Sequence, residues 1–174
     1  MVNKILKTIL GLMGIFFLVF LLAGIFISSV QYETSVTVNK PLEEVWTKFN
    51  DFDQLDQWIH EIKHIKPLKE TPDKVGSQYS LTIKNDGGDL IMLETITNYT
   101  PMESVSLHYE VGNMLKDDAY TFTDNGHFTI IHGHHTCRGN SYIFRCLFAF
   151  FKGMFKKTDQ KYMNQFKSWV EEGF

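Results

Sequence analysis

The clearest structural pattern in the sequence is residues 119–138, AYTFTDNGHFTIIHGHHTCR. Apolar and polar side chains alternate before and after the central Asp124-Asn125-Gly126. Alternation with a period of two is typical of a half-buried strand. Asn-Gly favours a type I′ turn, because both central residues of that turn need a positive φ. The stretch therefore predicts an antiparallel β-hairpin with one apolar face.

The same alternation continues upstream of this hairpin. It predicts strands over residues 75–84, 89–99 and 104–111, which are separated by an Asn-Asp-Gly-Gly turn and by Pro101. Residues 61–70 are ambiguous, because their apolar side chains recur every three residues and a proline opposes a helix there. Neighbouring strands joined by short turns are antiparallel, so the sequence predicts a meander of about six strands.

Helical patterns flank the meander. A strand over residues 32–39 is followed by two short helices over 41–49 and 51–60, and the pattern is helical again from Tyr142 to the C-terminus. The terminal helix is the only large element left to cover the apolar face of the sheet. The predicted fold class is α+β, an antiparallel sheet covered by a long C-terminal helix.

The N-terminal segment is apolar over a length that suits a membrane. Residues 8–32 carry no charged side chain, and about 20 apolar residues in a helix cross the hydrocarbon core of a bilayer. A cleaved signal peptide is the alternative, but its apolar region is usually shorter. Lys4 and Lys7 precede the segment, so the N-terminus is expected in the cytoplasm and the domain outside it. We predict a single-pass anchor over residues 1–31 and one domain over 32–174.

Composition excludes one class of partner. The formal net charge is −3, and no basic stripe runs along the predicted domain. Nucleic-acid binding needs such a stripe, so we expect no nucleic-acid partner. The 15 Phe indicate a large aromatic core or a surface that meets apolar material. No cofactor is predicted, and the sequence leaves the oligomeric state open.

An ordered series of short motifs resembles a known superfamily. The series is Val36-Thr37-Val38-Asn39-Lys40-Pro41, Glu44-Val45-Trp46, Asp51 with Trp58, Val75-Gly76-Ser77, Pro101, Asn125-Gly126 and Phe166-Lys167-Ser168-Trp169-Val170-Glu171. Residues 32–174 thereby resemble the START-like superfamily of polyketide cyclases/dehydrases and lipid-transport proteins, in its polyketide-cyclase-like branch with an N-terminal membrane helix. The resemblance implies a helix-grip fold, in which a curved sheet holds the C-terminal helix around a cavity for a lipid or another hydrophobic molecule. It assigns no catalytic residue.

We therefore expect a membrane-tethered domain that binds a hydrophobic small molecule or lipid between the sheet and the C-terminal helix. The residues expected to contact the ligand are Tyr79, Leu81, Met92, Glu94, Tyr109, Tyr120, Phe122, His132, His134, Met163 and Phe166. Glu94 shares the inward face of its strand with Met92, and His132 and His134 are expected to point towards the cavity or its mouth.

The histidines leave other functions open. His132 and His134 could supply two zinc ligands with Glu94 as a third, although unligated histidines at a strand end are the simpler interpretation. Glu94 with these histidines could also serve a cyclase- or hydrolase-type enzyme. His135 and Cys137 could pair as a thiolate and base, but no third group orients them.

Two further features have alternative interpretations. Cys137 and Cys146 could form a disulfide in an oxidising compartment or remain free thiols. Residues 142–157, YIFRCLFAFFKGMFKK, combine phenylalanines with basic side chains. This stretch could lie in a bilayer interface or could pack its aromatic rings on the sheet. A protein-interaction module that docks a membrane partner through this stretch is a third candidate function.

Overall fold

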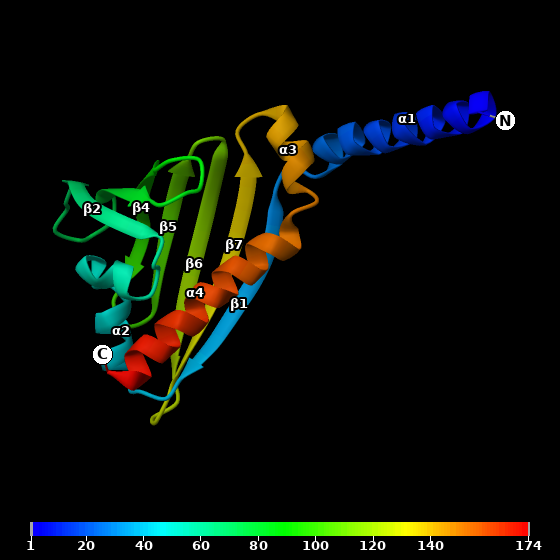
Figure 1. Cartoon of the computed structure of the whole chain (residues 1–174). Helices are drawn as coiled ribbons and strands as arrows, with labels where there is room; N and C mark the ends of the chain where they lie inside the picture. Colours follow the sequence, from blue (N-terminus) through cyan, green and yellow to red (C-terminus); the bar gives the residue numbers. More distant parts are fainter. Residues whose placement is uncertain (1, 174) are drawn as a thin grey trace.

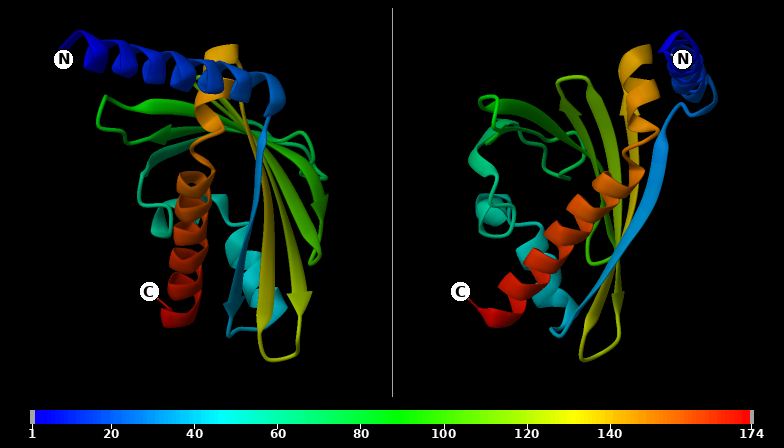
Figure 2. Two further views of the ribbon diagram at one scale, coloured as in Figure 1. Left: turned by 90° about the vertical axis from the view of Figure 1, so that its right-hand side faces the viewer. Right: turned by 45° about the vertical axis from the view of Figure 1, so that its right-hand side comes forward.

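A curved antiparallel sheet carries the fold, and helix α4 (Lys152–Glu172) lies across its concave face (Figures 1 and 2). The structure, a computed structural model, describes residues 2–173. The strands are β1 (Val30–Val38), β2 (Ile62–Lys69), β3 (Gln78–Ile83), β4 (Leu90–Thr100), β5 (Ser104–Val111), β6 (Met114–Asp124) and β7 (Thr129–Gly139). The remaining helices are α1 (Val2–Phe26), α2 (Leu42–Phe49), the 3₁₀ helix η1 (Phe52–Gln57) and α3 (Tyr142–Phe148). The predicted α+β helix-grip architecture is confirmed.

The sheet is a meander that β1 closes at one side. Its strand order is β1-β7-β6-β5-β4-β3-β2, and each neighbouring pair is antiparallel. The ambiguous stretch at residues 61–70 is therefore a strand, β2. It lies at the sheet edge, where a proline is tolerated, and its pairing with β3 shifts register between Pro67 and Lys69.

The β6–β7 hairpin has a longer loop than the sequence predicts. Asp124 pairs with Thr129, which leaves residues 125–128 in the loop. The Asp124 carboxylate accepts a hydrogen bond from the Gly126 N–H at 2.9 Å, and Gly126 has a φ of +79°. The second strand therefore begins three residues later than the sequence predicts. The side chains that point inward are Thr129, Ile131, His135 and Cys137, all buried.

An aromatic cluster fills one end of the space between the sheet and α4. The Phe49 ring lies 5.1 Å from the Phe122 ring and 5.1 Å from the Phe166 ring, centroid to centroid. Phe166 and Val170, in the C-terminal half of α4, are completely buried. This packing secures the C-terminal half of α4 against α2 and the sheet, so any room for a ligand lies beside its N-terminal half.

The C-terminal helical region is two helices instead of one. Backbone hydrogen bonds from Phe150 N to Leu147 O (3.1 Å) and from Phe151 N to Phe148 O (2.9 Å) tighten the chain at the end of α3. Such i→i−3 bonds are common at helix termini, and here the chain changes direction before α4 begins. The prediction of one continuous helix from Tyr142 is therefore wrong. Helix α3 contacts α1, whereas α4 packs against β1.

Helix α1 projects away from the domain (Figures 1 and 2). Within the described residues it is the one helix that is long and apolar enough to cross a membrane, over Asn3–Phe26. Its side chains are almost all exposed, so α1 is not a core helix of the domain. Cys146 of α3 faces α1, while Cys137 lies inside the sheet; both cysteines are buried and free in the part of the chain that the structure describes.

Candidate functional site

A cavity of about 340 Å³ lies between the sheet, η1 and the N-terminal half of α4. Pockets for small molecules usually measure about 300–1,000 Å³, so this one has room for a small ligand. Most of its wall is apolar. The apolar side chains include Leu55, Trp58, Ile62, Leu81, Met92, Val105, Leu107 and Met163.

More than half of the predicted ligand-contacting residues line this cavity. They are Leu81, Met92, Glu94, Tyr109, Tyr120 and Met163. Tyr79, Phe122 and Phe166 are also buried, but they belong to the surrounding core. Tyr79, for example, stacks on Phe52 with 4.5 Å between ring centroids. These three side chains support the cavity wall and do not line it.

His132 and His134 do not face the cavity. Both are exposed on the other face of β7, and the His134 ring lies 3.8 Å from the Glu33 carboxylate at the surface. The prediction that they point inward is wrong, because the inward residues Tyr120 and Phe122 of β6 pair with Gly133 and Ile131, and directly opposite residues lie on the same face of the sheet. His132 and His134 alternate with these inward residues and so lie on the opposite face. The two histidines therefore cannot share a zinc ion with Glu94.

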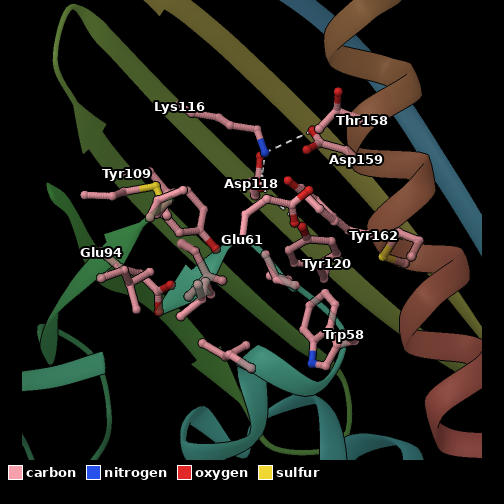
Figure 3. Close-up of a pocket in the computed structure, with 18 of the residues that line it drawn as sticks. Trp58, Glu61, Glu94, Tyr109, Lys116, Asp118, Tyr120, Thr158, Asp159 and Tyr162 are labelled. Carbon is pink, nitrogen blue, oxygen red and sulfur yellow. Dashed lines mark hydrogen bonds and ion pairs between the residues drawn. The ribbon is translucent and has the colours of Figure 1, made fainter. Parts of the chain in front are cut away.

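Inward residues of β6 and β7 instead meet one residue of β1 and one of α4 in a buried charge cluster. We call it the Lys116 cluster; its members are Tyr32, Lys116, Asp118, His135 and Asp159 (Figure 3 labels Lys116, Asp118 and Asp159). Lys116 Nζ lies 2.7 Å from Asp118 Oδ2 and 2.9 Å from Asp159 Oδ2. Tyr32 donates to Asp159 at 2.6 Å. His135 Nδ1 lies 2.8 Å from Asp118 Oδ1, and His135 donates this bond because a carboxylate only accepts.

Each charge in the Lys116 cluster stabilises its neighbours. Burial by itself would raise the pKa of Asp118, but the Lys116 ammonium and the His135 hydrogen bond hold that pKa below its usual range. Burial opposes the charge on Lys116, yet the two carboxylates raise its pKa above the usual value. Burial and the facing Asp159 raise the pKa of Tyr32. The lysine and Asp118 are therefore charged at neutral pH.

The same cluster brings together groups that could ligate a cation. Ligand atoms of Asp118, His135 and Asp159 lie within 4.8 Å of one another. The Lys116 ammonium already stands between the two carboxylates and offsets part of their charge. The arrangement is therefore that of a buried ion-pair network, in which lysine takes the position a metal cation would need.

Glu94 forms a second polar point in the cavity wall. Its side chain is 2% exposed, and within the described residues its Oε1 has no hydrogen-bond partner. Burial raises the pKa of Glu94 to about 8; the neighbouring Tyr109 hydroxyl opposes this shift and the Asp118 charge adds to it. At neutral pH Glu94 is therefore mainly a neutral acid, which can both donate and accept a hydrogen bond.

Two other polar atoms of the cavity wall are also unpartnered within residues 2–173. They are Trp58 Nε1 and Glu61 Oε2. A buried polar atom without a partner is costly, at about 1–3 kcal/mol. The cavity thus presents an apolar surface with several hydrogen-bonding atoms that a bound molecule could satisfy (Figure 3).

The cavity offers no activated thiol among the residues that the structure describes. The Cys137 Sγ lies 3.4 Å from the Tyr32 hydroxyl, and burial raises its pKa to about 11. The thiolate is the nucleophilic form of cysteine, so Cys137 is not prepared for nucleophilic catalysis. His135 is bonded to Asp118 and Thr34 and does not activate it.

A cavity held between a curved antiparallel sheet and a C-terminal helix defines a START-like, helix-grip protein. The chain belongs to the family described as polyketide cyclase/dehydrase and lipid transport, whose model matches residues 29–166. No curated protein matches the chain.

Several solved structures share the fold at low sequence identity. A START superfamily protein from Mycobacterium smegmatis has a TM-score of 0.70 at 15% identity, and the match covers 83% of this chain and 99% of that one. A protein from Thermus thermophilus has a TM-score of 0.68 at 12% identity, with 82% and 98% covered. The Zhui aromatase/cyclase from a Streptomyces species has a TM-score of 0.65 at 12% identity, with 83% and 94% covered. These likenesses concern the fold.

Proposed function

We propose that this protein is a membrane-tethered domain that binds one hydrophobic small molecule or lipid in the cavity beside the N-terminal half of α4. The observation that carries the proposal is the cavity itself: its wall is largely apolar, and it holds buried polar atoms without partners among the described residues. Apolar pockets with a few convergent polar groups are typical ligand sites. Membership of a family described by lipid transport supports the same function.

The ligand is expected to carry polar groups on an apolar body. A hydroxyl or carbonyl near Glu94 would satisfy its unpartnered oxygen, and a negatively polarised group could accept a hydrogen bond from Lys116. The ammonium has three N–H donors, and its contacts with Asp118 and Asp159 use two of them. Hydrogen bonds to Glu94 and Lys116 would fix the orientation of the ligand in the cavity.

Helix α1 supplies the proposed tether. Its length and apolar composition suit a transmembrane helix, and Lys4 and Lys7 near its start favour an N-terminus in the cytoplasm. In this arrangement residues 1–31 are the cytoplasmic tip and anchor, and residues 32–174 form a domain on the opposite side of the membrane.

A cavity-filling substitution tests ligand binding. We expect the full chain, purified in mild detergent and examined by native mass spectrometry, to retain about one small apolar molecule per chain. Leu107→Trp should lose this molecule, because Leu107 is buried in the cavity wall and an indole would occupy the space. Ile91→Trp is the matched control, since Ile91 lies exposed on the adjacent strand β4.

The outcomes separate the candidate functions. Equal masses of retained molecule for the wild type and Leu107→Trp would contradict the binding proposal. The Lys116 cluster and the acid Glu94 favour a cyclase-type enzyme as the second candidate. Recovery of the retained molecule chemically unchanged after incubation supports binding, whereas recovery of a rearranged product would support the enzyme.

A further inference from the structure

A band of exposed apolar side chains runs from α3 to the first turn of α4, next to the end of α1. We call it the α3 surface; its members are Ile143, Leu147, Phe150 and Met154, which are 37–58% exposed. Within the described chain these side chains stay substantially exposed, although α1 packs against Phe150. A contiguous exposed apolar surface marks an interaction site more often than chance exposure does.

The α3 surface is held against the C-terminal turns of α1 by direct packing. The Tyr142 hydroxyl donates to the Leu21 carbonyl of α1, and the Phe20 ring stacks on the Phe150 ring at 6.2 Å. Gly24 permits the close approach, since a Cβ at that position would collide with Cys146 Sγ. Helix α3 therefore lies alongside the last turns of α1.

This packing sets a depth for α3. An α-helix rises 1.5 Å per residue, so Phe20 lies roughly 10 Å along the axis from Ile27. If α1 spans the bilayer, the residues that pack against Phe20 and Leu21 must lie below the lipid headgroups. Interfacial helices bury their apolar faces by about 5–10 Å in the bilayer, and the distance of roughly 10 Å between Phe20 and Ile27 places α3 at a similar depth.

The charge around the α3 surface suits lipid headgroups. Residues 125–158 contain no aspartate or glutamate, although acidic residues outnumber basic ones in the whole chain. The basic side chains in and just after α3 are Arg145, Lys152, Lys156 and Lys157, and the three lysines are exposed. Basic side chains beside a membrane-inserted surface are attracted to anionic lipids.

We propose that α3 and the first turn of α4 form a second membrane-seated element, with the α3 surface buried in the leaflet from which α1 emerges. Met154 is exposed on this surface and also lines the cavity. Its half-buried neighbour Phe155 lines the cavity as well. The cavity wall on this side is therefore made by residues that would contact lipid. A lipid-soluble ligand would enter from the bilayer at this point. This inference rests on the proposed membrane span of α1.

Quenching by brominated lipid tests the depth of the α3 surface. The full chain is reconstituted in vesicles of phosphatidylcholine and phosphatidylglycerol, with or without bromine on the acyl chains, as the variants Phe150→Trp and Leu68→Trp. Phe150 and Leu68 are equally exposed, at 53%, but Leu68 lies on β2 at the far edge of the sheet (Figure 1). The native Trp46, Trp58 and Trp169 are buried in the domain and give a common background.

The fluorescence added by Phe150→Trp should fall to about half or less in brominated vesicles, because acyl-chain bromine would lie within the 5–10 Å depth of an interfacial helix. The fluorescence added by Leu68→Trp should be the same in both kinds of vesicle. Leu147→Trp provides a second reporter on the same surface and should behave like Phe150→Trp. Unquenched Phe150→Trp and Leu147→Trp in protein that floats with the vesicles would overturn the inference and leave the tether intact. Protein that does not float with the vesicles would overturn the tether itself, and the inference with it, whereas ligand binding is judged separately by the Leu107→Trp experiment.

Discussion

Replacing Lys116 with methionine is expected to lower the free energy of unfolding at pH 7 by about 3–5 kcal/mol, which is the usual effect of breaking a buried ion pair. Methionine replaces the methylene chain of lysine with an apolar chain of similar length, but it removes the ammonium that lies 2.7 Å from Asp118 and 2.9 Å from Asp159. Two carboxylates would then remain buried without a counter-ion. In a chain of this size the thermal midpoint should fall by roughly 6–20 °C, measured by near-ultraviolet circular dichroism of the full chain in detergent.

The loss should depend on pH in a defined direction. The pKa of Asp118 is lowered in the folded protein, so its contribution to stability is present above the ordinary carboxyl pKa, about 3.9, and is lost as the pH falls through the folded-state value. Without Lys116 the Asp118 carboxylate should take up its proton at a higher pH. The difference in thermal midpoint between Lys116→Met and the wild type should therefore shrink from pH 7 to pH 5.

Lys63→Met is the matched control. Lys63 also lies 2.7 Å from a carboxylate, that of Asp89, but both side chains are more than 40% exposed. Exposed ion pairs contribute about 1 kcal/mol or less, so this variant should unfold close to the wild-type midpoint at both pH values. A Lys116→Met protein as stable as Lys63→Met at pH 7 would contradict the role assigned to the Lys116 cluster.

Glu94→Gln is expected to make the protein more stable than the wild type at pH 8, with a smaller difference at pH 5. The pKa of Glu94 is raised to about 8 by burial, whereas a glutamate in an unfolded chain titrates near 4.3. Between these values the folded protein holds a proton that the unfolded chain has released. Wild-type stability should therefore fall by up to about 1.4 kcal/mol per pH unit as the pH rises through this window, a loss that glutamine removes.

Thermal midpoints of the full chain in detergent at pH 5, 6, 7 and 8 check this prediction. Glu110→Gln serves as the control, because the Glu110 side chain is 54% exposed on the neighbouring strand β5, and its curve should run parallel to that of the wild type. Parallel curves for Glu94→Gln and the wild type would show that the Glu94 carboxyl is ionised and solvated, and so not a neutral polar point of the cavity.

The alternation of apolar and polar residues predicts most strands of the sheet correctly. Alternation predicts that Met92 and Glu94 share the inward face of one strand, and Met92 is partly buried and Glu94 buried. The β7 register was not predictable in the same way. An Asn-Gly pair favours a two-residue turn, but the Asp124 carboxylate binds the Gly126 N–H and the loop takes four residues. That difference changes the register by two residues, which keeps each side chain on the same face. With either loop an odd-numbered residue of β7 lies opposite the inward Phe122, so cross-strand pairing places His132 and His134 outward.

The Lys116 cluster was missed because its residues look like those of a loop. Residues 114–118 contain a lysine and two aspartates, yet they continue the strand β6. Burial of such side chains depends on partners from β1, β7 and α4, which are distant in the sequence. A local signal did exist: Lys116, Asp118, Tyr120 and Phe122 repeat with a period of two. The three charged side chains of residues 114–118 disfavour a strand in this segment by composition alone.

A crystal structure of the full chain, purified from the membranes that produce it and without added ligand, would show whether the cavity holds a bound molecule. We expect continuous electron density of a small molecule in the 340 Å³ cavity, with polar atoms within hydrogen-bonding distance of Glu94 or Lys116. A cavity collapsed by its own side chains, or one that holds only ordered water, would contradict this expectation.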